Sequence, residues 1–289
     1  MLIPKHSNNS QPYPYLKVIR TALIALGVVV LALFACTRWI ESHSVFYPSK
    51  DVQRTPKDVG ISYEEVTIPT ADGISLNAWL VRGSPRSKSI VIYCHGNAGN
   101  IGNRIYRLKV FHDLGLNVLL FDYRGFGKST GRPSEQGIYE DAAAVYDYLA
   151  NRPDVDCHHI AAYGKSIGGA VVIDLATKRS LAGFVVDSSF SSARDMAELL
   201  YPGLPAWFVT YRFDSVSKVR NLKIPKLFIH NPDDGIVPLV IGQRLFAAAA
   251  QPKIFVPMRG GHGQGLVYDT RKFSQTLQVF MMSIGMLEE

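Results

Sequence analysis

The tight turn predicted around Ser166 constrains this chain more than any other stretch. Residues 159–163 form a short apolar run typical of a buried strand, and residues 171–176 continue as an apolar helix. Between them, Gly164-Lys-Ser166-Ile-Gly168 fits the G-x-S-x-G pattern of a nucleophile elbow. Such a turn strains the backbone of the serine, so the residues two before and two after it must be very small. The pattern therefore predicts a serine hydroxyl raised above a helix N-terminus, where developing negative charge is stabilised.

Short apolar runs alternate with helical stretches along most of the chain. We expect strands at 63–68, 75–81, 89–94, 117–122, 158–163, 182–187, 226–230 and 253–256, and helices at 101–114, 135–150, 171–177, 242–250 and 272–284. The first two runs, joined by a turn-rich connection, predict an antiparallel hairpin. The other runs predict an α/β fold whose mostly parallel central sheet carries helices on both faces.

The alternation breaks between residues 188 and 222, where aromatic residues cluster between prolines. We expect a cap-like insertion there. It is either a lid that shapes the substrate site or a pair of helices that only packs against the body.

The N-terminal part of the chain predicts a single membrane-spanning helix. Residues 21–37 carry no charge, and the span reaches about 20 residues once Lys17 and Arg20 extend toward the interface. We expect a disordered tail at 1–15, a transmembrane anchor at 16–40 and a linker at 41–60. The alternatives are a cleaved secretory signal and a lipoprotein signal lipidated at Cys36. Basic residues flank both ends of the span, so orientation is not predicted.

Composition excludes several other classes of protein. The net charge is +7, but no block of five or more Lys and Arg residues indicates a nucleic-acid partner. The three cysteines imply no disulfide framework. Both Gly-Lys-Ser triplets, at 127–129 and 164–166, lack the earlier glycine of a phosphate-binding loop. Residues 157–159 (Cys-His-His) have no second ligand cluster, and side chains entering a strand alternate between faces, so we expect them to be structural. No cofactor or metal is predicted.

A serine nucleophile needs a base and an orienting acid, in the chain order Ser, Asp or Glu, His for an elbow enzyme. The strand expected at 226–230 is followed by Asp233 and Asp234, of which we favour Asp234 as the acid. His262, in a glycine-rich loop after the last strand, is the expected base.

The oxyanion needs two backbone N–H donors. We expect one from Ile167, directly after the nucleophile. The other should come from Asn97, with Ala98 as the alternative, in the loop after residues 89–94. In the same loop, we expect His95 to brace the backbone.

These residues resemble the alpha/beta-hydrolase superfamily. They are most similar to its membrane-anchored Bem46-like group, related to ABHD13-type and serine aminopeptidase S33-like hydrolases. The similarity is carried by residues 95–100 (His-Gly-Asn-Ala-Gly-Asn), 122–127 (Asp-Tyr-Arg-Gly-Phe-Gly), 131–135 (Gly-Arg-Pro-Ser-Glu), 163–169, Asp234 and 261–262, and by Val45-Phe-Tyr-Pro-Ser49 after the span.

The resemblance implies an alpha/beta-hydrolase domain over 61–289, with Ser166 as nucleophile, His262 as base, Asp234 as orienting acid and no cofactor. One departure is Asn231-Pro232, where the group usually has a His-Gly pair, and we expect it to affect loop shape alone.

The predicted function is that of a membrane-anchored serine hydrolase, which cleaves ester or thioester bonds of small or lipid-like acyl substrates through an acyl-enzyme. The alternatives are a peptidase or aminopeptidase-like activity and a non-catalytic membrane-anchored scaffold.

Overall fold

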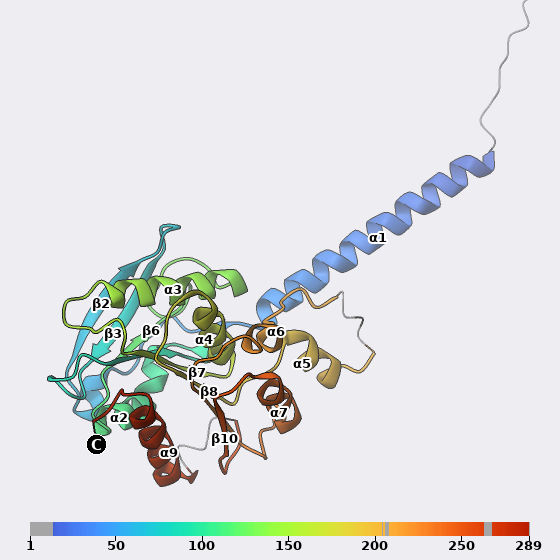
Figure 1. Ribbon diagram of the computed structural model, residues 1–289. Coiled ribbons are helices and arrows are strands. Elements are labelled where there is room, and N and C mark those ends of the chain that lie inside the picture. The colour runs from blue at the N-terminus through green and yellow to red at the C-terminus, as the bar shows by residue number, and fades with distance from the viewer. Residues whose placement is uncertain (1–13, 204, 206–207, 263–267, 289) are drawn as a thin grey trace, which may run out of the picture.

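An eight-stranded sheet forms the centre of the computed structural model, which describes residues 14–203, 205, 208–262 and 268–288 (Figure 1). Its strand order is β10-β9-β8-β7-β4-β6-β3-β2, and all pairs are parallel except β2 with β3 and β3 with β6. The strands are β2 (Tyr63–Pro69), β3 (Ser75–Val81), β4 (Ile90–Cys94), β6 (Val118–Phe121), β7 (Ile160–Lys165), β8 (Phe184–Asp187), β9 (Lys226–His230) and β10 (Lys253–Pro257). The predicted hairpin and mostly parallel sheet are confirmed.

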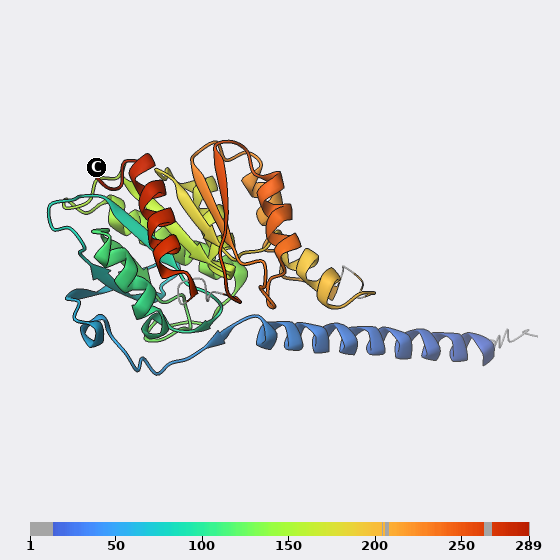
Figure 2. The same ribbon diagram turned by 90° about the horizontal axis from the view of Figure 1, so that it is seen from below.

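The helices cover both faces of the sheet, as predicted. Within the described residues the helices of the body are α2 (Ile105–Asp113), α3 (Glu135–Ala150), α4 (Ile167–Lys178), α5 (Ala193–Leu200), α6 (Ser215–Val219), α7 (Leu239–Ala248) and α9 (Thr270–Ser283), with short 3-10 turns at Pro56–Val59 and Ile101–Arg104; the N-terminal helix α1 (Pro14–Ser44) stands apart from them. One core cluster joins α2 and α9 to one face of the sheet, and the other joins α3, α4, α6 and α7 to the opposite face (Figure 2). In β4, Ile90 and Ile92 belong to one cluster and Val91 and Tyr93 to the other, because side chains alternate along a strand.

Strand β4 is the point at which the strand order changes direction. The next strand of the sheet, β6, pairs with one edge of β4, and the following strand, β7, pairs with the other edge. The connection after β4 leads to α2 on one face, whereas β7 leads to α4 on the other. Two loops that leave neighbouring parallel strands toward opposite faces open a crevice at their carboxyl ends. The fold therefore provides a binding crevice beside Ser166.

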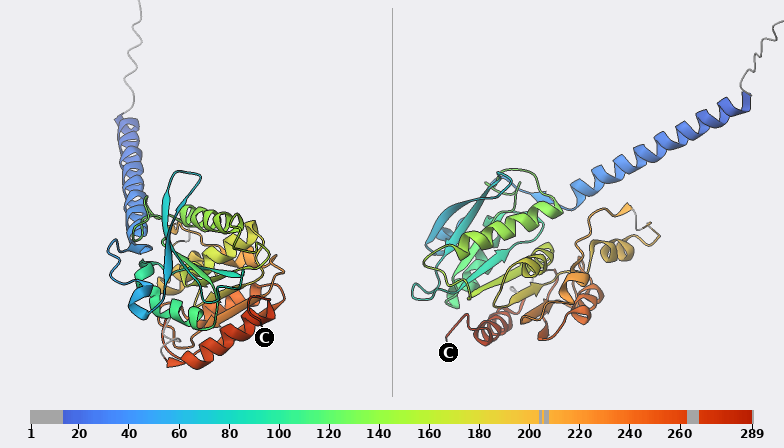
Figure 3. Two further views of the ribbon diagram at one scale, coloured as in Figure 1. Left: turned by 90° about the vertical axis from the view of Figure 1, so that its left-hand side faces the viewer. Right: turned by 45° about the horizontal axis from the view of Figure 1, so that its top comes forward.

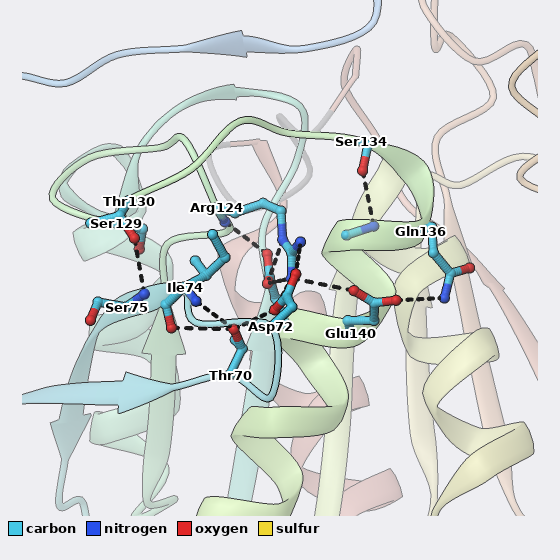
Figure 4. A network of polar contacts seen from close by, with 12 residues as sticks. Thr70, Asp72, Ile74, Ser75, Arg124, Ser129, Thr130, Ser134, Gln136 and Glu140 are labelled. Carbon is cyan, nitrogen blue, oxygen red and sulfur yellow. Dashed lines mark hydrogen bonds and ion pairs between the residues drawn. The ribbon is translucent and has the colours of Figure 1, made fainter.

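A buried arginine ties the hairpin to the loop after β6 and to α3 (Figure 4). Arg124 donates through Nε to Asp141 at 2.8 Å and through Nη1 to Asp72 at 2.7 Å. Asp72 in turn accepts from the Thr70 hydroxyl at 2.6 Å. One guanidinium thus satisfies carboxylates from two elements, so Arg124, within residues 122–127, has a structural role away from the elbow.

Helix α1 projects away from the body along most of its length (Figures 1 and 3). Its segment Tyr15–Thr37 has a mean hydropathy of 2.5 and no buried share, so it is long and apolar enough to cross a membrane. The same length and composition suit a signal sequence. The tail predicted at 1–15 lies outside the described residues except for its last two, which begin α1.

The segment predicted as a linker at 41–60 differs from that expectation. It begins inside α1, continues into the short strand β1 (Tyr47–Pro48), which pairs with β5 (Ala98–Gly99), and ends in a 3-10 turn. Phe46 is buried, and its ring contacts those of Tyr211 and Phe213 at 5.7 and 6.3 Å. The large apolar side chain holds this segment against the body and against Tyr211 and Phe213, in the part of the chain where a cap-like insertion is expected.

Candidate active site

Ser166 stands at the turn between β7 and α4, as the sequence predicts. Its φ of 54° and ψ of −120° lie in a region that L-residues rarely occupy. A Cβ at Gly164 would lie 2.2 Å from the Gly168 carbonyl oxygen, and a Cβ at Gly168 would lie 2.1 Å from that of Cys94. Any larger residue at 164 or 168 would collide with the backbone, so only glycine permits the tight turn that holds Ser166 in its strained conformation.

The structure brings His262 and Asp234 together. His262 Nδ1 lies 2.8 Å from Asp234 Oδ2, while Asp234 Oδ1 accepts the N–H groups of Ile236 and Val237 at 2.9 and 2.8 Å. Asp234 is buried, whereas Asp233 is exposed. Of the two carboxylates, Asp234 is therefore the one that contacts the imidazole.

The environment of Asp234 keeps it ionised. Burial by itself raises its pKa, but the hydrogen bonds from His262 and from the Val237 N–H outweigh burial and hold the pKa below its ordinary value. A charged carboxylate on Nδ1 fixes the imidazole so that Nε2 faces away from Asp234.

Asn231 holds the loop that carries His262, which the sequence reasoning missed. This residue is 2% exposed, and its Nδ2 donates to the Gly261 carbonyl at 2.6 Å. The expectation that Asn231 affects loop shape is correct, but the loop in question is the one that positions the expected base. No sequence pattern links residues thirty positions apart in this way.

The loop after β4 approaches the nucleophile closely. A Cβ at Gly96 would lie 3.7 Å from the Ser166 Cβ, and Asn97 lies at the rim of the same crevice. The Asn97 side chain donates to the Val45 carbonyl at 2.9 Å, and its own carbonyl accepts the Tyr47 N–H at 2.9 Å. The segment after α1 thus fixes the loop from which an oxyanion donor is expected, while Ile167 begins α4 beside Ser166.

His95 is buried among aromatic rings, as expected for a bracing residue. Its Nδ1 lies 2.7 Å from the Gly96 carbonyl, and its ring lies 4.4 Å from that of Tyr123. Burial lowers the pKa of His95 to about 3, so the imidazole is neutral. A neutral histidine at 0% exposure holds the loop and does not reach solvent or the cavity.

A cluster of buried charges lies directly beneath Ser166. Asp187 accepts from Arg107 Nη1 at 2.6 Å and from the Tyr163 hydroxyl, and its Oδ1 lies 3.6 Å from Lys165 Nζ. Burial by itself raises the pKa of Asp187, but the charges of Lys165 and Arg107 hold it well below its usual range. Burial lowers the pKa of Lys165 to about 8. The Asp187 carbonyl also accepts the Ser166 N–H at 2.8 Å, so the cluster supports the elbow.

Ser166 lines two cavities. The first, of about 610 Å³, is mostly apolar and is walled by the cap-like insertion, by the end of α1 and by Ile167; its lining includes Thr37, Ser44, Val45, Phe190, Met196, Leu200, Tyr211 and Phe213. The second, of about 350 Å³, is more polar than the first and is called the polar cavity below; its lining includes His262 and Lys165. A larger cavity of about 1190 Å³ lies against α3 and the β2–β3 turn, and none of the residues predicted for catalysis lines it.

One group of residues within the described ranges could offer three metal ligands, namely Asp156, Cys157 and His158, whose ligand atoms lie within 4.8 Å of one another. The strand alternation expected for Cys157 and His158 is wrong, because β7 begins only at Ile160 and both residues lie in the preceding turn. The group is mostly exposed and sits at the end of β7 opposite Ser166, so it has no part in the site.

Three comparisons place the chain among known proteins. Residues 85–235 match the family described as serine aminopeptidase, S33. The chain is 35% identical over 270 residues to protein Rv2307c of Mycobacterium tuberculosis (92% of this chain, 94% of that protein), and 34% identical over 240 residues to protein bem46 of Schizosaccharomyces pombe (80% and 79%). The solved structure of the esterase Pf2001 of Pyrococcus furiosus is similar with a TM-score of 0.70 at 22% identity, covering 83% of this chain and 97% of that one.

Proposed function

Because the chain belongs to the serine aminopeptidase S33 family of α/β hydrolases, we propose that it cleaves acyl esters or thioesters through an acyl-enzyme on Ser166. The observation that carries the proposal is the pairing of His262 with the buried Asp234 at 2.8 Å, on the wall of a cavity that Ser166 also lines. Base, orienting acid and strained serine come from three distant parts of the chain, and a catalytic arrangement accounts for all three.

In the proposed reaction the Ser166 hydroxyl attacks the acyl carbonyl and passes its proton to His262. Asp234 stabilises the imidazolium that forms. The N–H groups of Ile167 and Asn97 receive the oxyanion, aided by the N-terminus of α4. His262 then protonates the departing alcohol or thiol, and water releases the acyl group by the same steps.

We assign the acyl chain to the apolar cavity. Its lining contains aromatic and aliphatic side chains of the cap-like insertion, so the insertion shapes the substrate site. Thr37, Ser44 and Val45 complete the wall at the end of α1. With α1 as a membrane anchor, this cavity faces the region where the anchor leaves the bilayer, and a lipid-like acyl substrate is the natural occupant.

An aminopeptidase reaction fits these cavities less well. Such an enzyme has to hold the free ammonium of its substrate, and a carboxylate serves best for that purpose. No carboxylate is present among the described residues that line the two cavities beside Ser166.

Labelling with a fluorophosphonate probe tests the proposed function. The folded wild-type protein should be labelled, Ser166→Ala should not, and Ser189→Ala, which alters another buried serine nearby, should be labelled like wild type. A folded wild-type protein that is not labelled would favour the non-catalytic scaffold instead.

A further inference from the structure

Of the two cavities beside Ser166, only one is in contact with the expected base. His262 lines the polar cavity of about 350 Å³ and not the apolar one. The imidazole has to deliver a proton to the oxygen or sulfur of the leaving group. The leaving group of the proposed reaction therefore occupies the polar cavity, and this step rests on the function proposed above.

Three cationic side chains line the polar cavity. Arg104, Arg107 and Lys165 line it, and no Asp or Glu is among its described lining residues. Asp187 lies behind the wall and offers one negative charge to Arg107 and Lys165 together. Asp234, which pairs with His262, places a second negative charge near Lys165, so the three lining cations outnumber these two carboxylates by one.

Two of these cations have donors without a hydrogen-bond partner among the described residues. Lys165 is 7% exposed, and its Nζ has no hydrogen-bond partner among the described residues, since Asp187 lies 3.6 Å away. The Nε of Arg104 is also buried without a hydrogen-bond partner there. A buried ammonium that makes no hydrogen bond is costly, and such a group persists where a ligand completes its surroundings.

We infer that the polar cavity is a subsite for an anionic group, a phosphate or a carboxylate, carried on the leaving alcohol of the acyl ester. Its volume lies at the small end of ligand cavities, about 300–1,000 Å³, which suits a compact head group and not a second long chain. In the reaction the bond between the acyl carbon and the alcohol oxygen breaks as Ser166 Oγ forms its bond to that carbon. The proton from Ser166 reaches the departing oxygen through His262, and the anionic alcohol leaves with its charge unchanged.

Three esters with one hexanoyl chain test this inference: the monoesters of glycerol, of glycerate and of glycerol 3-phosphate. We expect kcat/KM for at least one anionic ester to exceed that of the glycerol ester by roughly 10- to 100-fold, mainly through KM. The glycerate and phosphate arms show which anion is preferred.

Variants then assign the preference to the cavity. Arg104→Gln, on a half-exposed 3-10 turn, should reduce the ratio of anionic to neutral kcat/KM several-fold, and Lys165→Met should reduce it further. Lys109→Gln is the matched control, because Lys109 is a cation on α2 that pairs with Asp113 and does not line the cavity. Its ratio should equal that of wild type.

Calorimetry with glycerol 3-phosphate and glycerate, compared with glycerol, gives a second measurement that does not depend on turnover. Equal kcat/KM for the three esters, or no binding of either anion, overturns the inference while fluorophosphonate labelling leaves the serine hydrolase intact. Failure of labelling would instead overturn the proposed function.

Discussion

Removing the Asn231 side chain should displace His262 without unfolding the protein. The Asn231→Ala substitution deletes the 2.6 Å hydrogen bond to the Gly261 carbonyl, in a residue that is 2% exposed. A neutral hydrogen bond of this kind contributes about 1 kcal/mol to the free energy of unfolding. Its loss costs more if the Gly261 carbonyl stays shielded from water. Asn231 Oδ1 is buried without a hydrogen-bond partner among the described residues, so its removal offsets part of the loss. We expect a net destabilisation of about 1 kcal/mol, or roughly 2–4 °C in Tm.

The catalytic effect should be larger than this small change in stability suggests. Gly261 directly precedes His262, so the lost bond lets the loop carry the imidazole away from its productive position. If about 1–2 kcal/mol separates the productive loop position from the others, kcat should fall about 5- to 30-fold with little change in KM. Hydrolysis of p-nitrophenyl butyrate measures kcat and KM, and thermal unfolding measures Tm.

Asn117 provides a matched control at the other end of the sheet. It is 1% exposed, and its Nδ2 donates to the carbonyls of Ser87 and Ser89 at 2.8 and 3.0 Å, just before β6 begins. Asn117→Ala should lower Tm at least as much as Asn231→Ala and leave kcat unchanged. Wild-type kcat in Asn231→Ala, or an equal loss of kcat in both variants, would refute the assigned role of Asn231.

Three further predictions concern the turn at Ser166, the orienting acid and the polar cavity. Gly168→Ala places a Cβ 2.1 Å from the Cys94 carbonyl, so Tm should fall by the equivalent of about 1–3 kcal/mol or more, and probe labelling should disappear. Asp234→Asn should lower kcat by about 10³–10⁴, whereas Asp233→Asn should stay within about twofold of wild type, as measured by ester hydrolysis. Burial lowers the pKa of Lys165 to about 8, so this ammonium is charged below that pH and loses its charge above it. The preference for an anionic over a neutral ester should therefore decline as pH rises through about 8, and a flat ratio from pH 7 to 9 would contradict this assignment.

Patterns local in the sequence predicted most of the framework. The two glycines around Ser166 predicted the turn, because the turn requires residues without a side chain at both positions and all of these residues lie within five positions of the sequence. Strand periodicity predicted the eight strands of the central sheet within a few residues but not the short strand β5, because alternation and apolar runs reflect burial on one face or on both. The favoured Asp234 is the carboxylate that contacts His262. Segment 41–60 was predicted less well, because its burial depends on Phe46 meeting aromatic residues 165 or more positions away.

The sequence by itself determined the elbow, the α/β alternation and the apolar N-terminal span, since each depends on residues that are close together in the chain. Only the tertiary structure decided that Asn231 holds the loop of His262, that the segment after α1 fixes the loop of Asn97, and that three cations gather on one side of Ser166. These features join residues that are far apart in the sequence, and the interactions between them depend on distance in space. A sequence records the charge of Lys165 but not the burial that lowers its pKa, because burial is a property of the folded chain.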